Sequence, residues 1–232
     1  MCAFIRNRSI NFDGGQRICP GRAVLKVDIE NFFPSITFTR VLGLFSSLGF
    51  TAQASFILAR LTTFGDRLAQ GAPTSPSISN LIMRGIDLRL KNLASTWELK
   101  YLRYSDDMFF HKEKNFNHPK FASYVMKIIK DGGFAVNDGK TKYHPKGLPR
   151  TTLGLLTHGE KPKIPGSQRH IYRSMFFKAS RNIHWAHENR DRLRGIAEWY
   201  KCVHGRNDTY IQYRAILNNE ARLRIHASYQ SK

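Results

Sequence analysis

The spacing of apolar residues divides the chain into short strands and amphipathic helices. The run AVLKVDI, residues 23–29, is rich in apolar and β-branched side chains and predicts a buried strand that ends before Pro34. Apolar positions three and four residues apart predict helices over residues 37–62, 78–93 and 118–134. The first part of the chain therefore combines strands with helices.

Turn-forming residues lie between these elements. The Gly/Pro/Ser-rich sequence QGAPTSPS, residues 70–77, predicts a loop. Two apolar runs flank residues 105–107, so a strand, a turn and a second strand are expected there. Further short strands, and a hairpin that turns at His158–Gly159, are expected at residues 134–137, 141–144 and 151–165.

The last part of the chain has a helical pattern. From Ser167 onward the apolar spacing predicts helices, with breaks near Gly195 and Gly205. The order of elements predicts an α+β unit followed by a helical segment. With 232 residues, the chain can form one large or two small domains around a sizeable core.

Charge narrows the class of partner. The chain carries 37 Lys and Arg residues against 17 Asp and Glu, a formal net charge of +20. Residues 140–232 hold 19 of the basic and 6 of the acidic residues. This imbalance favours a polyanion, with nucleic acid as the first candidate. A membrane partner is disfavoured, because no Lys-rich amphipathic terminus stands out and no apolar run approaches the roughly 20 residues that cross a bilayer.

The cysteines and the first residues of the chain indicate in which cellular compartment the protein is expected. Cys2, Cys19 and Cys202 are odd in number and far apart, so they form neither a disulfide framework nor a CxxC zinc site. The first residues contain no apolar core of signal-peptide length. Both observations predict a protein of the reducing cytoplasm.

Three carboxylates are the strongest chemical signal. Asp28 ends an apolar strand, and Asp106 and Asp107 lie in the turn between two further strands. Taken singly, each is a common structural residue at a strand end or turn. Together, carboxylates at the rims of adjacent strands can hold two Mg²⁺ ions roughly 3.5–4 Å apart. We therefore predict a two-metal site, which would also explain the adjacent negative charges.

Five segments resemble, in order and approximate spacing, the palm and primer-grip motifs of reverse transcriptases. They are VLKVDIENFFPSI, QGAPTSPSISNLI, YLRYSDDMFF, GGFAVNDGKT and TLGLLTHGEKPKIP. The chain resembles a bacterial reverse transcriptase, most of all the retron type. The resemblance implies the right-hand polymerase fold, in which an antiparallel palm sheet with packed helices precedes a basic helical thumb.

The resemblance also assigns catalytic roles. Asp28, Asp106 and Asp107 would bind the two Mg²⁺ ions, and Ile29 would lend its backbone carbonyl. One ion would activate a primer 3′-hydroxyl, and the other would stabilise the departing pyrophosphate. Lys140 matches the family lysine proposed to protonate that pyrophosphate.

Further motif positions concern the nucleotide and the primer. Phe33 matches the steric gate, whose ring would crowd a ribose 2′-OH and favour dNTPs. The alternative is a core phenylalanine, the role expected for Phe32. The remaining assignments are contacts to the incoming nucleotide and template at Gln70 and Gly71, a substrate contact at Tyr104, and a primer grip at Leu153, Gly154 and Leu155.

The same resemblance divides the chain. Residues 1–22 would be a remnant of the fingers, residues 23–150 the palm, residues 151–165 the primer-grip hairpin and residues 166–232 the thumb. Because only the end of the second family motif is recognisable at the front, we expect the fingers to be mostly absent.

The implied function is RNA-directed DNA polymerisation. The chain would extend a primer on a structured RNA template with dNTPs, giving RNA-linked single-stranded DNA in antiphage defence, and a retron effector protein would be a further partner. Residues 12–18 lack the Asn-Ala-x-x-His signature of retron enzymes. Two alternatives therefore remain. The chain could be another bacterial defence reverse transcriptase or a group II intron-like one, or it could be a catalytically weak palm–thumb module that binds structured RNA. Phe33 argues against an RNA-dependent RNA polymerase.

Overall fold

The computed structural model describes residues 22–157 and 159–218, which form two compact units. The first comprises the described residues up to Leu148, and the second begins at Pro149. Most of the expected fingers remnant, and the end of the expected thumb, lie outside the described residues. The expected α+β class, with an antiparallel sheet and packed helices, is confirmed.

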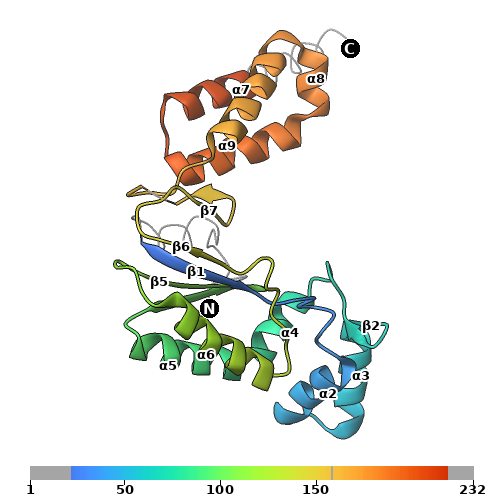
Figure 1. Cartoon of the computed structure of the whole chain (residues 1–232). Helices are drawn as coiled ribbons and strands as arrows, with labels where there is room; N and C mark the ends of the chain where they lie inside the picture. The colour runs from blue at the N-terminus through green and yellow to red at the C-terminus, as the bar shows by residue number, and fades with distance from the viewer. Residues whose placement is uncertain (1–21, 158, 219–232) are drawn as a thin grey trace. The chain divides into compact units, whose positions relative to one another are not determined.

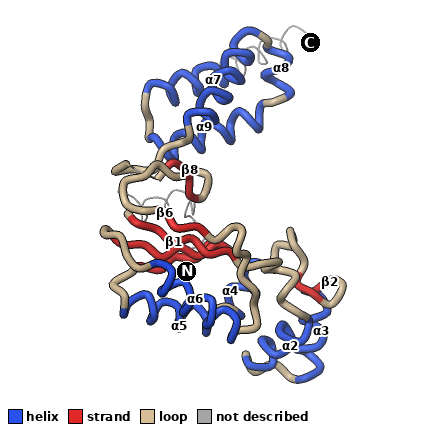
Figure 2. The backbone as a smooth tube through the Cα atoms, viewed as in Figure 1, coloured by secondary structure: helices blue, strands red, loops and turns tan. Residues whose placement is uncertain are grey.

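The first unit is built around an antiparallel four-stranded sheet of order β4-β5-β1-β6. Helices α5 and α6 cover one face of this sheet, as Figures 1 and 2 show. The elements of this unit are β1 (Ala23–Asp28), α2 (Phe38–Ser47), α3 (Ala52–Thr62), β2 (Thr63–Phe64), β3 (Arg67–Leu68), α4 (Ser75–Ile82), α5 (Arg84–Thr96), β4 (Lys100–Tyr104), β5 (Asp107–Lys112), α6 (His118–Asp131) and β6 (Lys142–His144).

Alternation along the strands separates the two faces of the sheet. Leu25 and Val27 of β1, with Met108 and Phe110 of β5, belong to the core that the helices cover. On that face the Phe110 ring meets Phe121 of α6 edge-on, with 5.0 Å between ring centroids. Because successive side chains of a strand point to opposite faces, the residues between them lie on the other face. These are Lys26 and Asp28 of β1, and Asp107 and Phe109 of β5.

The second unit has its own core. The Phe176 and Tyr213 rings stack within it at 3.7 Å, and Leu155 is fully buried there. Its elements are β7 (Thr151–Thr152), β8 (Leu155–Leu156), α7 (Gly166–Arg181), α8 (Ile183–Glu188), α9 (Arg190–His204) and helical residues 208–218.

Two predicted helices are each divided in the structure. The helix predicted over residues 37–62 breaks between Ser47 and Ala52, where Gly49 adopts a φ of 91°. The side chain of Thr51 then accepts a hydrogen bond from the Ala54 amide and starts α3. The helix predicted over residues 78–93 is interrupted at Met83. Helical spacing predicted both segments, but it does not mark the Thr51 cap that starts α3 or the one-residue break at Met83, where no side chain caps α5.

The loop and strand boundaries also shift. Helix α4 begins at Ser75, inside the loop predicted over residues 70–77, because Pro76 suits the first turn of a helix. The strand predicted at residues 134–137 is reduced to a single bridge between Ile29 and Val136.

The hairpin segment of the second unit contains a tight turn that the sequence did not predict. Leu153 and Gly154 form this turn between β7 and β8, with φ of 53° and 77°. The chain then turns back a second time, because Leu156 and Lys163 form an antiparallel bridge. The predicted turn at His158–Gly159 falls between these two residues, and His158 itself is outside the described residues.

Helix α9 continues through Gly195, so the break predicted there is wrong. The break predicted at Gly205 is confirmed, since this residue ends α9 with a φ of 75°.

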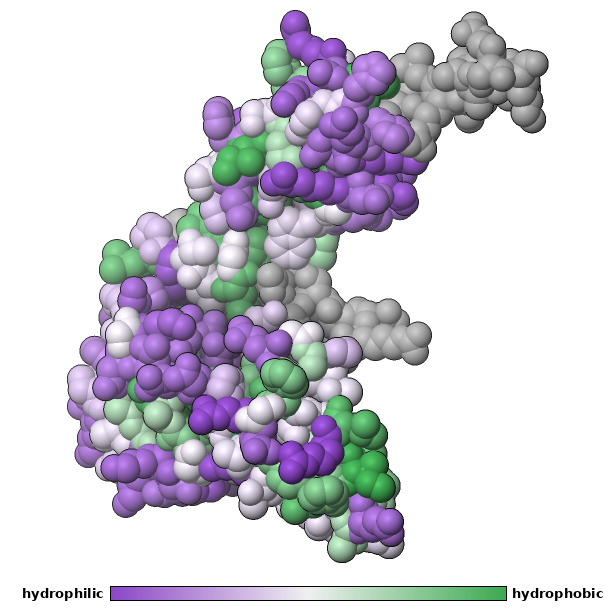
Figure 3. All heavy atoms as spheres, turned by 90° about the vertical axis from the view of Figure 1, so that its right-hand side faces the viewer, coloured by the Kyte–Doolittle hydropathy of each residue, from purple (hydrophilic) through white to green (hydrophobic). Residues whose placement is uncertain are grey.

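Apolar side chains are exposed on α3 and β2. Leu61 is 77% and Phe64 84% exposed, and Figure 3 shows a group of apolar side chains at its lower right. None of the described helices is long and apolar enough to span a membrane.

Replacing Phe121 with Ala should destabilise the first unit by about 3–5 kcal/mol, because a fully buried aromatic ring leaves a cavity. Urea denaturation followed by circular dichroism measures this loss. Phe64→Ala, at an exposed ring, is the control and should change stability by no more than about 0.5 kcal/mol. Equal effects of the two substitutions would contradict the described core.

Candidate active site

Strand register brings two of the predicted carboxylates together. Asp28 and Asp107 are directly opposite each other in the β1–β5 pairing. They lie on the face of the sheet that α5 and α6 do not cover, and Asp28 is 3% exposed. The Ile29 amide donates to the Asp106 carbonyl at 3.1 Å, which ties the third aspartate to the end of β1 through its backbone.

The turn that carries Asp106 has a strained backbone. Tyr104 of β4 and Asp107 of β5 are register partners, so Ser105 and Asp106 form a two-residue hairpin turn. Ser105 has a φ of 54°, a left-handed conformation that costs energy for a residue with a side chain. Other contacts must therefore hold this turn in place.

A buried arginine supplies those contacts. The Arg103 side chain is fully buried and donates to both oxygens of Asp87 on α5, each at 2.8 Å. It also donates to the Ser105 carbonyl at 3.0 Å and to the Asn80 side chain of α4 at 3.1 Å. The Tyr101 hydroxyl donates to Asp87 at 2.7 Å. This network anchors the strained turn to two helices.

Two lysines contact the facing carboxylates. The Lys26 ammonium lies 2.7 Å from Asp107 Oδ1, and the Lys140 ammonium lies 3.6 Å from Asp28 Oδ1. Burial raises the pKa of the Asp107 carboxyl above its ordinary value, and the hydrogen bond and charge of Lys26 oppose that rise. Each ammonium offsets part of the repulsion between two like charges opposite each other.

Carboxylate oxygens are the groups that could bind a metal ion at this site. Among the described residues, no three Asp, Glu, His or Cys side chains form a group that could hold a metal ion, so the three predicted aspartates do not make up a complete metal site in this conformation. The Asp28–Asp107 pair nevertheless fits a divalent cation, because its oxygens are hard ligands and each carboxylate already contacts a cationic group.

The two adjacent phenylalanines have different environments. Phe32 is 4% exposed and belongs to the core, as expected. Phe33 is only partly buried, with its ring centroid 5.2 Å from that of Phe32. Its ring is therefore accessible in part, five residues beyond Asp28.

The Gln70–Gly71 segment is exposed. Gly71 has a φ of 89°, and a Cβ added there would meet nothing within 4 Å. The Ser75 hydroxyl donates to the Ala69 carbonyl and closes this loop onto the start of α4. Asn80 of the same helix accepts a hydrogen bond from Arg103, which also holds the carboxylate turn. Helix α4 therefore contacts both the Gln70–Gly71 loop and the network that holds the turn.

The predicted primer-grip residues belong to the second unit. Leu153 and Gly154 form the turn of the β7–β8 hairpin, and Leu155 packs in the core of that unit.

Sequence reasoning missed Lys26, Asp87 and Arg103. A signal for Lys26 was present, since a residue two positions before Asp28 on a strand shares its face. The Asp87–Arg103 pair had no comparable signal in the sequence. Its two residues are 16 positions apart, one on a helix and one on a strand, so no periodic spacing relates them.

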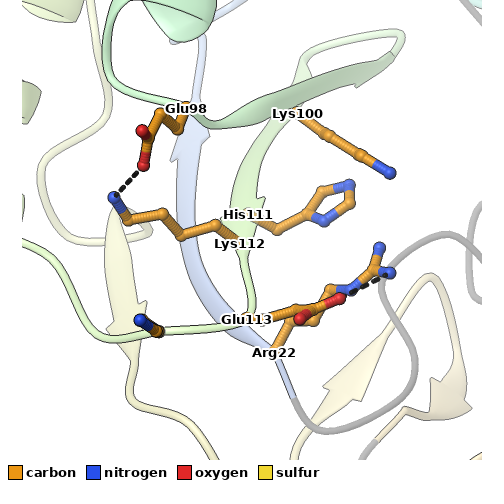
Figure 4. Close-up of a pocket in the computed structure, with 7 residues that line it drawn as sticks. Arg22, Glu98, Lys100, His111, Lys112 and Glu113 are labelled. Atoms are coloured by element: carbon orange, nitrogen blue, oxygen red, sulfur yellow. Dashed lines mark ion pairs between the residues drawn. The ribbon is translucent and has the colours of Figure 1, made fainter.

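A cavity of about 280 Å³ lies away from the carboxylates. Its residues include Lys112, five positions after Asp107 and therefore roughly 17 Å along the strand. Figure 4 shows its two ion pairs, Lys112–Glu98 at 4.0 Å and Arg22–Glu113 at 3.7 Å. None of the predicted site residues lines this cavity, so the carboxylate turn remains the candidate site.

Comparison with known proteins bears on the whole first unit. Residues 2–157 match the family described as reverse transcriptase (RNA-dependent DNA polymerase). The chain is 34% identical over 141 residues to the retron Ec86 reverse transcriptase of Escherichia coli, covering 61% of this chain and 44% of that protein. It is 32% identical over 187 residues to the retron Mx65 reverse transcriptase of Myxococcus xanthus, covering 69% and 43%. The chain thus spans less than half the length of these relatives.

Among solved structures, the chain is similar to apo telomerase from Candida tropicalis truncated from its C-terminal domain. The TM-score is 0.46 with 13% identity, over 64% of this chain and 36% of that chain.

Asp87→Asn should destabilise the chain by about 3–5 kcal/mol, because it leaves the buried Arg103 guanidinium without its carboxylate. The control is Asp131→Asn, which breaks the exposed Arg89–Asp131 pair and should cost at most about 1 kcal/mol. Urea denaturation of both variants measures the difference, and similar losses would show that the buried network does not hold the turn.

Proposed function

The chain belongs to the reverse transcriptase (RNA-dependent DNA polymerase) family, and we propose that its carboxylate turn is the active site of RNA-directed DNA polymerisation. The observation that carries this proposal is the direct pairing of Asp28 with Asp107 beside the hairpin turn of Asp106. The reaction would extend a primer on an RNA template with dNTPs.

The three aspartates would hold the divalent cations that reverse transcriptases generally use. Bound Mg²⁺ ions, two in our proposal, would lower the pKa of the primer hydroxyl and neutralise charge on the phosphates. The Ile29 backbone carbonyl would be a further ligand. Asp28 and Asp107 are opposite each other in the strand register, and Asp106, in the adjoining turn, would complete the set of ligands.

Lys140 is the proposed general acid. Its side chain is 62% exposed and its ammonium lies 3.6 Å from Asp28 Oδ1, so it can reach an anion that leaves the carboxylate site. There it would donate a proton to pyrophosphate.

Three groups would define the nucleotide position. The partly buried ring of Phe33 would exclude a ribose 2′-OH. The exposed Gln70–Gly71 backbone would contact the incoming nucleotide and the template, since a glycine without a side chain allows close approach. Tyr104, the register partner of Asp107, would contact the substrate from β4.

The second unit would bind the nucleic acid. The β7–β8 hairpin is the proposed primer grip, and the helices that follow are the proposed thumb. Exposed basic side chains on α7, among them Arg173, Lys178 and Arg181, suit phosphate contacts that set affinity without reading sequence.

Similarity to retron reverse transcriptases supports a retron-type role. In that role the template would be a structured RNA, the product RNA-linked single-stranded DNA in antiphage defence, and an effector protein a further cytoplasmic partner.

A second candidate is an RNA-binding module with weak catalysis. It is favoured by the described carboxylates, which do not gather in threes. Polymerase activity of purified residues 1–232 on a primed RNA template separates the two candidates.

The double substitution Asp106→Asn and Asp107→Asn should abolish cation-dependent dNTP incorporation while leaving RNA binding within about twofold, because it removes ligands without removing basic groups. Primer extension and filter binding measure the two properties. Asp66→Asn, which breaks an exposed ion pair with Arg60, is the control and should retain activity. Full activity in the double variant would refute the proposed site.

Phe33→Ala should raise incorporation of rNTPs relative to dNTPs, because it removes the ring that would crowd the 2′-OH. Single-nucleotide extension with each sugar measures the ratio. Phe32→Leu is the matched control, since it alters the buried neighbouring ring and should leave sugar preference unchanged. An unchanged ratio in Phe33→Ala would make Phe33 a packing residue.

A further inference from the structure

Lys26 forms the shortest ion pair at the carboxylate site. Its ammonium is 2.7 Å from Asp107 Oδ1, and both side chains are largely shielded, at 30% and 21% exposure. Lys140 is farther from its carboxylate, at 3.6 Å, and more exposed, at 62%. Solvent screens the Lys140 contact more strongly, so Lys26 is the principal counter-charge of the facing aspartates.

The surroundings of Lys26 direct it to Asp107. Lys26 and Lys142 are directly opposite in the β1–β6 pairing, so two like charges share one face of the sheet. Like charges at such positions repel each other. On its other side Lys26 lies near the buried Phe109 ring, 6.0 Å from its centroid, over which the lysine stem can extend toward Asp107.

This arrangement has a consequence for cation binding. A divalent cation at the Asp28–Asp107 pair would need the oxygen that the ammonium contacts, and the two positive charges would repel each other. Lys26 and a divalent cation are therefore competitors for Asp107.

We propose that Lys26 is an internal counter-cation, which neutralises Asp107 in the metal-free protein and which a divalent cation must displace. The inference rests on the proposed function, since it takes the paired aspartates as cation ligands. Lys26 would thereby raise the divalent-cation concentration that the site requires, while protecting the fold from carboxylate repulsion when no cation is bound.

Equilibrium titration of residues 1–232 with Mn²⁺, followed by the electron paramagnetic resonance signal of the free ion, tests this proposal. Lys26→Met keeps an unbranched side chain over Phe109 and removes the charge. It should bind Mn²⁺ roughly tenfold more tightly than the unmodified chain, because a competing cation is gone. Lys142→Met removes an equal charge from the opposite position on the same face and should change affinity by less than about twofold.

Two further measurements guard against a misfolded variant. Lys26→Arg retains the charge and should keep the affinity within about threefold of the unmodified chain. In thermal denaturation with a chelator, Lys26→Met should unfold at a lower temperature than Lys142→Met, and saturating Mn²⁺ should narrow that gap.

Unchanged or weaker Mn²⁺ binding by Lys26→Met would overturn the inference, as would an equal gain in Lys142→Met. Absence of Mn²⁺ binding in every variant would overturn it too. These outcomes are independent of polymerisation. A chain that never extends a primer but shows the Lys26→Met gain would refute the proposed function alone, and an active chain without the gain would refute this inference alone.

Discussion

The register between β1 and β5 is the constraint on which the candidate site depends. Leu25 and Val27 of β1 and Phe110 of β5 must face α5 and α6 to bury their surface. That requirement places Asp28 and Asp107 opposite each other on the other face. A slip of one residue would exchange the two faces, expose the core and bury the carboxylates. Core packing and site geometry are therefore specified by the same pairing.

Placing two carboxylates at opposed positions creates an electrostatic cost that the chain offsets with its own lysines. One of them, Lys140, comes from the segment that follows the Ile29–Val136 bridge, where the Asn137 amide donates to the Asp28 carbonyl at 2.8 Å. The other, Lys26, precedes Asp28 by two residues on the same strand. Each of the two facing carboxylates thus has a lysine ammonium within 3.6 Å, which offsets part of the repulsion between them.

Much of this arrangement could be predicted from the sequence, because strands with period-two alternation place their terminal residues at one edge. Asp28, Asp107 and the turn between β4 and β5 followed from that pattern, as did the α+β class. The helix breaks at Gly49 and Met83, the start of α4 at Ser75 and the β7–β8 turn did not. The break at Gly49 and the β7–β8 turn use left-handed backbone, and Pro76 favours the start of α4, none of which apolar spacing encodes. The break at Met83 has neither a left-handed residue nor a side-chain cap. The Arg103–Asp87 pair was also missed, since a buried charge pair is defined by tertiary packing.

The hairpin that carries Asp106 and Asp107 is held by a buried cation on one face of the sheet and by a partly exposed cation on the other. On the helix-covered face, the buried Arg103 binds the Ser105 carbonyl and Asp87, and its removal from water makes the contact strong and inflexible. On the other face, the partly exposed Lys26 binds Asp107 through a flexible stem that can move away. A fixed backbone with an exchangeable counter-charge is what a cation-dependent site requires, because the ligands must keep their positions while the charge between them changes.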